Sequence, residues 1–180
     1  MPAIHSCELP ADALLNRYSG SGAFADCYVS GIAGAVSHAE FVEAFYTTAV
    51  FKLERLILRL LVSRPSTDAE ARQLAQGSRE SFAAWTVEAR ATDQLLLSDF
   101  TGRTKSWLMV AAPQNAGLSG TRLFFGSAVL PVRGATESRT SLGFAFAALL
   151  GFHKLYSRIL LRSAVSRLSR RPITPTPYQG

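Results

Sequence analysis

The feature that most constrains this sequence is a long amphipathic segment near its C-terminus, from Leu142 to about Ser169. Its apolar residues recur at steps of three and four, while Lys154, Arg158 and Arg162 form a basic row at steps of four. The segment ends before Pro172, which has no amide proton to continue a helix. The pattern predicts a single helix about 40 Å long, which must lie across the whole domain.

Two further helices are predicted earlier in the chain. Ser37 and Glu40 form a capping-box pattern at the start of a helix that is expected to run to about Val62. Ser66 or Thr67 is expected to begin a shorter helix over residues 68–76, which ends at a glycine that favours the left-handed terminator conformation.

Five strands are predicted, one before the first helix and four after the second. Beyond residue 77 the apolar period changes from about 3.6 to 2, which indicates strands rather than helices. Short turns separate the later strands, so neighbouring strands should be antiparallel. The predicted strands are Asp26–Ile32, Ser81–Arg90, Gln94–Asp99, Thr104–Ala112 and Thr121–Val132.

The length of 180 residues and the 48% apolar content favour one domain with one sizeable core. We expect an irregular N-terminal arm over residues 1–22, an α+β domain over 23–171 and a flexible tail over 172–180. The longest apolar run, 142–152, is about half the roughly 20 residues that a membrane helix needs. The N-terminus lacks the pattern of a signal peptide, so the expected location is cytoplasmic.

The net charge of +6 comes entirely from the last helix and tail, because residues 142–180 contain six Lys or Arg and no acid. A solvated basic face, with cations near a helix C-terminus, is the favoured interpretation. Weak contact with an anionic membrane is the alternative. Nucleic acid is not expected, since the aromatic residues are not interleaved with these cations. Cys7 and Cys27 match no metal spacing and are expected to be reduced thiols with a packing role.

The order of these elements resembles the START-like or polyketide-cyclase (SRPBCC) superfamily, and most closely its uncharacterised bacterial families. The last helix contains a Phe-His-Lys-hydrophobic step at Phe152–Leu155, and the segments Arg103–Val110 and Thr121–Val129 stand where that superfamily has central strands. The resemblance covers residues 24–170. It implies a helix-grip fold, in which a curved antiparallel sheet packs against a long C-terminal helix around an apolar cavity. The superfamily usually has six or seven strands, more than the five predicted here.

Few residues indicate catalysis. The sequence has no phosphate-binding glycine loop, no nucleophile elbow and no histidine pair with metal spacing, so no cofactor, metal or catalytic residue is assigned. His153 is the exception, because it falls on the apolar side of the last helix. It is either a neutral, hydrogen-bonded structural histidine or a group that binds a polar ligand head or moves a proton.

The resemblance implies an apolar small-molecule or lipid-binding protein. The alternatives are a cyclase- or dehydratase-type enzyme with His153 as its acid or base, and a peripheral module that binds anionic membranes through the basic helix. The oligomeric state stays open. Aromatic residues fill ordinary cores as well as sites, so each candidate also has a core-filling interpretation. The predicted ligand-binding residues are Trp85, Trp107, Met109, Phe125, His153 and Tyr156.

Overall fold

A computed structural model of the chain describes residues 3–20, 22–53, 55, 66–113, 119–131 and 142–170, with side chains in the last segment from 154 onward. Among these residues, seven strands form one antiparallel sheet in the order β1-β2-β7-β6-β5-β4-β3. The strands are β1 (His5–Ser6), β2 (Phe24–Ile32), β3 (Ser81–Phe82), β4 (Trp85–Ala91), β5 (Gln94–Asp99), β6 (Thr104–Ala111) and β7 (Thr121–Val129).

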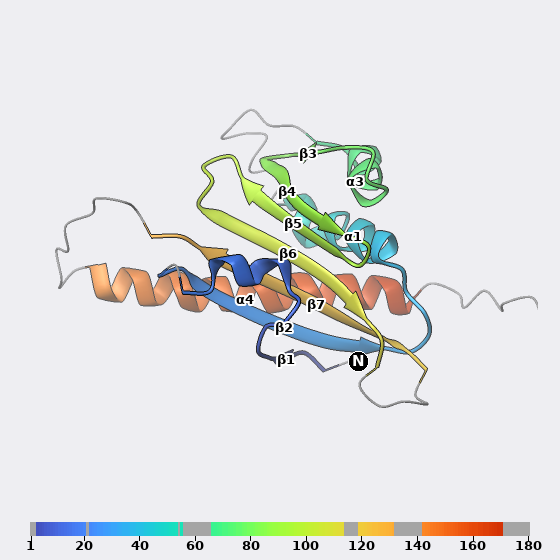
Figure 1. Cartoon of the computed structure of the whole chain (residues 1–180), viewed down its shortest axis with the longest axis horizontal. Coiled ribbons are helices and arrows are strands. Elements are labelled where there is room, and N and C mark those ends of the chain that lie inside the picture. The colour runs from blue at the N-terminus through green and yellow to red at the C-terminus, as the bar shows by residue number, and fades with distance from the viewer. Residues whose placement is uncertain are drawn as a thin grey trace, which may run out of the picture.

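The helices α1 (His38–Tyr46), α3 (Asp68–Ala75) and α4 (Leu142–Ser169) lie on one face of this sheet, as Figure 1 shows. The long α4 contacts β2, β7 and α1, and its bounds match the predicted helix. The predicted α+β class, with an antiparallel sheet packed against a long C-terminal helix, is therefore confirmed.

The first helix is shorter than predicted. Its capping box is present, with Ser37 Oγ accepting from the Glu40 amide, but α1 ends at Tyr46. Thr48 is the cause, because its hydroxyl accepts a hydrogen bond from the Phe51 amide at 3.2 Å and so caps a new helical segment from Ala49. The predicted continuation over 56–62 lies outside the described residues. The second predicted helix is confirmed as α3, with Thr67 as its cap and Gly77 in the left-handed region.

The predicted strand Ser81–Arg90 is divided into β3 and β4. Ala83 has a φ of 53°, a conformation that non-glycine residues rarely adopt, and it turns the chain back so that Phe82 pairs with Trp85. A bulge between Val87 and Ala89 interrupts the pairing of β4 with β5. The turn at Ala83 and the short β1 raise the number of strands among the described residues to seven, above the five predicted.

The described residues of the N-terminal arm, 3–20 and 22, contain regular elements where an irregular arm was expected. The arm contains β1, which pairs with β2, and the 3-10 helix η1 (Leu14–Tyr18), which contacts β5, β6 and β7 on the face opposite the long helices. Figure 1 shows η1 in front of the sheet and α4 behind it. The sheet is therefore covered on both faces. The predicted tail 172–180 and linker 134–141 lie outside the described residues.

Two groups of buried side chains result. The helix-side core contains the side chains of α1, α3 and α4 together with one set of strand residues, among them Tyr28, Leu108 and Phe125. The arm-side core contains the other set, among them Leu15, Trp107 and Met109. No helix within the described residues is both long enough and apolar enough to cross a membrane.

Candidate functional site

The six predicted ligand-binding residues do not form one group. Trp85, Phe125 and Tyr156 belong to the helix side, whereas Trp107 and Met109 lie on the arm side of the sheet. The register explains this separation, because Trp107 pairs with Gly126 and Leu108 pairs with Phe125, so that Trp107 and Phe125 point to opposite faces. His153 lies within α4, but its side chain is outside the described part of the structure.

Phe125 and Trp107 are held in tightly packed surroundings. The Phe125 ring lies 4.8 Å from the Phe45 ring, within a group of aromatic side chains that joins α1 to the sheet. Trp107 is fully buried, and its Nε1 donates to Gln94 Oε1 at 2.8 Å. These contacts agree with the core-filling interpretation of both residues.

Gln94 fixes the arm over the sheet. Its Oε1 also accepts from the Leu14 amide at 2.9 Å, and its Nε2 donates to the Asp12 carbonyl at 3.1 Å. Gln94 is 3% exposed, so its side-chain amide forms these hydrogen bonds away from bulk water.

A charged cluster holds the far end of η1. Glu88, on the β4 bulge, accepts from Lys105 Nζ at 2.8 Å, from Arg17 at 3.1 Å and from the Tyr18 hydroxyl. Burial alone would raise the pKa of Glu88, but the hydrogen bonds from Lys105 and Tyr18 outweigh it and lower that pKa. Lys105 Nζ also donates to Ser98 at 2.9 Å. Every charge in the cluster has a partner within the protein, which indicates a structural role.

The strongest candidate site lies where α4 passes the open edge of β2. The short β1 pairs only with Tyr28 and Val29, so among the described residues the beginning of β2 has β7 on one side and no strand on the other. A hollow of about 520 Å³ follows this edge. It is lined by Ser6, Cys7, Glu8, Leu9, Asn16, Ser19, Phe24, Ala25, Asp26, Cys27, Tyr28, Lys154 and Arg158.

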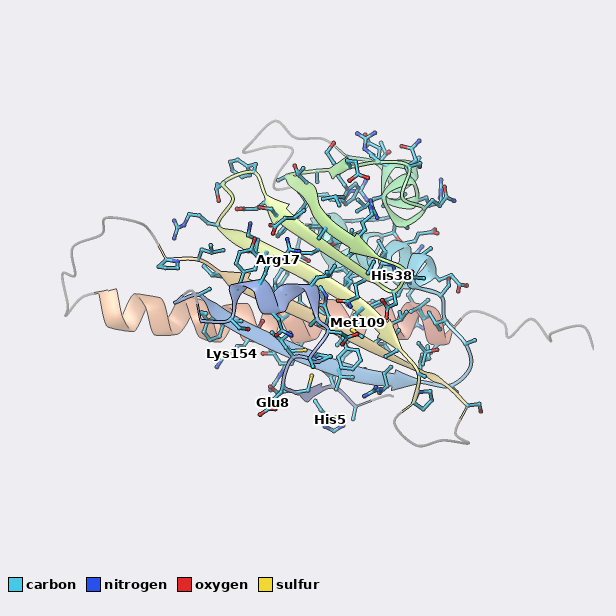
Figure 2. All side chains as sticks on the ribbon, viewed as in Figure 1. His5, Glu8, Arg17, His38, Met109 and Lys154 are labelled. Atoms are coloured by element: carbon cyan, nitrogen blue, oxygen red, sulfur yellow. The ribbon has the colours of Figure 1, made fainter. Side chains whose placement is uncertain are left out.

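Two cationic side chains of α4, those of Lys154 and Arg158, line this hollow. Lys154 Nζ lies 5.5 Å from the centre of the Phe24 ring, and the Arg158 guanidinium lies 5.3 Å from that of Tyr28. The two cations are one helical turn apart. The two rings are four residues apart in β2 and therefore lie on the same face of the strand, so the two cation–ring pairs follow each other along the interface. Neither cation forms an ion pair with a described carboxylate. Figure 2 shows Lys154 at the same edge of the molecule as Glu8.

Further polar residues near these cations come from β2, β7 and α4. Asp26 of β2 accepts a hydrogen bond from the Ser127 hydroxyl of β7. Burial, and then the charge of Asp26, raise the pKa of the Tyr28 phenol, while the charge of Arg158 opposes this rise. The Ser157 hydroxyl on α4 is 1% exposed and has no hydrogen-bond partner among the described residues. This is a polar corner in an otherwise apolar helix–sheet interface.

Most of this corner has no signal in the sequence. The basic row named Lys154 and Arg158, but the pattern did not show that they face β2. Asp26 and Ser127 gave no signal, because their proximity depends on the pairing of strands that are about a hundred residues apart in the chain.

A second hollow, of about 790 Å³, lies on the arm side. Its floor contains Val29, Met109 and Phe124, and its rim contains Arg122 and several acidic residues. The Arg122 guanidinium is 5.2 Å from the Phe124 ring, and its Nε donates to the Ala112 carbonyl at 2.8 Å. Of the predicted site residues whose side chains the structure describes, Met109 alone lines either of these hollows.

No group of three or more His, Cys, Asp or Glu side chains within the described ranges is placed to hold a metal ion. Comparison with protein-family models and with curated proteins finds no match to this chain. The START-like resemblance therefore stays a prediction, while the α+β fold stands on the structure itself.

Proposed function

We propose that this protein binds an apolar small molecule or lipid that carries an acidic head group. The binding site is the hollow between the open edge of β2 and α4. The observation that carries this proposal is the pair of cations, Lys154 and Arg158, which line the hollow without a carboxylate partner among the described residues.

The charge distribution supports an anionic head group. Arg158 and Lys154 belong to the segment that supplies the whole net charge of the chain, and that segment contains no acid. An arginine and a lysine one turn apart can bind a carboxylate or phosphate from two sides. Two acids, Glu8 and Asp26, also line the hollow, and Asp26 accepts a hydrogen bond from the Ser127 hydroxyl.

The size and lining of the hollow support a small organic ligand. Its volume of about 520 Å³ falls within the usual range of ligand pockets. Phe24, Leu9 and the aliphatic part of Lys154 supply apolar contacts for the body of the ligand, while the two cationic groups supply the polar ones. The START-like resemblance implies an apolar small molecule or lipid, which agrees with the apolar body of the proposed ligand.

Native mass spectrometry of the full chain, as purified from cells, tests this proposal. The expected result is a bound species that is released on unfolding and is identified as an apolar acid. The purified protein should also bind a medium-chain fatty acid when its own ligand has been removed. A protein that carries no bound species and does not bind such an acid would refute the proposal.

The outward face of α4 favours a second, weaker candidate function: contact with an anionic membrane surface. Leu155 and Ile159 are 57% and 40% exposed, and Arg162 lies on the same face of the helix. Exposed aliphatic side chains beside cations are typical of helices that lie in a membrane interface. We expect weak binding that decreases with salt, because the larger apolar face of α4 is buried in the domain.

Sedimentation with vesicles tests this contact. Vesicles that contain phosphatidylserine should retain more protein than phosphatidylcholine vesicles, and the double variant Leu155→Ser, Ile159→Ser should lose that difference. Phe100→Ser is the matched control, because Phe100 is 53% exposed but lies in the turn between β5 and β6. Equal binding by both variants would contradict a role for the α4 face.

A further inference from the structure

The two cysteines of the chain lie opposite each other across the β1–β2 pairing. His5 pairs with Val29 and Ser6 with Tyr28, and the same register brings Cys7 opposite Cys27. The Cys7 amide donates to the Cys27 carbonyl at 3.0 Å. The two Sγ atoms are 3.2 Å apart. An approach of about 1 Å would bring them to the bond length of a disulfide.

The two thiols differ in their access to solvent. Cys7 is half-buried and lines both hollows, whereas Cys27 lines only the hollow at β2. Cys27 is 3% exposed and lies within the arm-side core. Cys7 is therefore the sulfur that meets a reagent first, and Cys27 is the sulfur placed to react with Cys7.

The electrostatic surroundings give the same order. Burial raises the pKa of both thiols, but at Cys7 the hydrogen bond with Cys27, and then the positive charge of Arg122, partly offset this effect. At Cys27 the hydrogen bond with Cys7, and then the charges of Cys7 and Asp26, raise the pKa further. The first thiolate to form is thus that of Cys7, and the thiolate is the reactive form of cysteine.

We propose that Cys7 and Cys27 form a modification site, at which a small-molecule disulfide such as oxidised glutathione converts the two thiols into an intramolecular bridge between the N-terminal arm and β2. The proposal is independent of the proposed ligand. The sequence predicts only a packing role for these cysteines. A separation of 20 residues does not show that their sulfurs are close, and this closeness is the reason for proposing a modification site instead.

The chemistry proceeds in two exchange steps. Cys7 loses its proton, and its thiolate attacks one sulfur of the reagent; the reagent's sulfur–sulfur bond breaks, and the first reagent thiolate leaves and takes up a proton. Cys27 then loses its proton and attacks the Cys7 sulfur of the mixed disulfide, which releases the second reagent thiolate. The protein gives up two protons and two electrons, and the small disulfide is reduced to two thiols.

Bridge formation would fix the part of the arm that borders both hollows. Cys7 and Glu8 belong to the lining of each. In the reduced protein this part of the arm is held to β2 by backbone hydrogen bonds, which include the one from Cys7 to Cys27. A covalent bond at the same position adds a link that requires reduction before the arm can separate from β2.

Intact-mass measurement of the native full chain tests the proposal. The reduced protein is treated with oxidised glutathione, quenched with acid and compared with the variant Cys27→Ser. The wild type should lose two hydrogens and carry no glutathione, whereas Cys27→Ser should retain one glutathione on Cys7. Peptide mapping without reduction should then recover the Cys7 peptide linked to the Cys27 peptide.

Three results would overturn the proposal. A wild type that retains glutathione on Cys7 would show that Cys27 does not reach it. A disulfide-linked dimer would show that the reaction occurs between chains. A wild type that reacts only in denaturant would show that the native site is closed to the reagent. Because the decisive sample is the wild-type protein, none of these results depends on the folding of a variant.

Discussion

Leu15 provides the sharpest test of the arm as part of the folded domain. This side chain is fully buried, and it packs in the arm-side core with Trp107. Its Cδ2 lies only 3.0 Å from the position that a Cβ would occupy at Gly126, while Trp107 Cε3 lies 2.9 Å from the same position. The glycine thus allows Leu15 and Trp107 to meet above the sheet.

The variant Leu15→Ala should leave a cavity above the sheet and destabilise the domain by about 2–5 kcal/mol, the usual cost of truncating a buried leucine. This is a large part of the roughly 5–15 kcal/mol that stabilises a typical domain. For a chain of this size, each kcal/mol lowers Tm by about 2–4 °C. Urea unfolding followed by tryptophan fluorescence measures the loss, because Trp107 lies under the altered residue.

Leu53→Ala is the matched control. Leu53 is 59% exposed, so the same change of side chain there should alter the free energy of unfolding by less than about 0.5 kcal/mol. If Leu15→Ala were as stable as Leu53→Ala, the arm would not be packed on the sheet in solution. The two-sided coverage of the sheet would then be wrong.

Three further predictions concern the polar contacts of the arm. Gln94→Leu should cost about 1–3 kcal/mol in chemical unfolding, because it leaves buried donors without an acceptor, whereas equal stability would show that water replaces the amide. Glu88→Gln should destabilise by about 1–2 kcal/mol at neutral pH by removing the carboxylate that pairs with Lys105. The folded-state pKa of Glu88 is lowered, so its contribution to stability is complete above its ordinary pKa of 4.5 and is lost as the pH falls below that value. If the difference in unfolding free energy between wild type and Glu88→Gln stayed constant down to acid pH, this reasoning would be contradicted. A Cys7–Cys27 bridge should stabilise the domain by about 3 kcal/mol, given the 20-residue separation, and calorimetry of oxidised and reduced protein should show a higher Tm for the oxidised form.

Much of the fold could be predicted because its signals are local. Ser37 with Glu40 marked the start of α1, Gly77 marked the end of α3, and the proline at 172 marked the approximate end of α4. Each of these residues acts on backbone groups within a few positions of itself, so a single sequence contains the necessary information.

The features that the sequence did not predict depend on distant contacts or on strain. The order of the arm depends on Leu15 meeting Trp107, which lies far away in the chain. Ala83 gave no turn signal, because alanine disfavours the positive φ that it adopts here. The sequence places Thr48 within a continuous helix, although its hydroxyl caps the segment that follows.

The candidate site was partly predictable for the same reason. Charge patterning singled out Lys154 and Arg158, since charge is a property of the sequence. The sequence does not show which aromatic candidates share a face, because this depends on the register, which places Trp107 and Phe125 on opposite faces of the sheet. The faces follow from which residue of β6 pairs with which residue of β7, and that pairing is set by the whole sheet.

A titration of the ligand-binding hollow separates it from the hollow on the arm side. The double variant Lys154→Gln, Arg158→Gln should weaken the binding of a medium-chain fatty acid by at least about tenfold, since each charge-assisted hydrogen bond to a carboxylate contributes roughly 1.5–3 kcal/mol. Arg122→Gln should leave this affinity unchanged, because Arg122 lines the other hollow. The reverse result would place the ligand on the arm side.

The most direct test of the proposed function is a crystal structure of the protein with a bound medium-chain fatty acid. We predict that the carboxylate lies within hydrogen-bond distance of Lys154 Nζ and the Arg158 guanidinium, with the alkyl chain against Phe24 at the edge of β2. A carboxylate bound at Arg122 on the arm side, or a hollow at β2 that remains empty at saturating ligand, would contradict it.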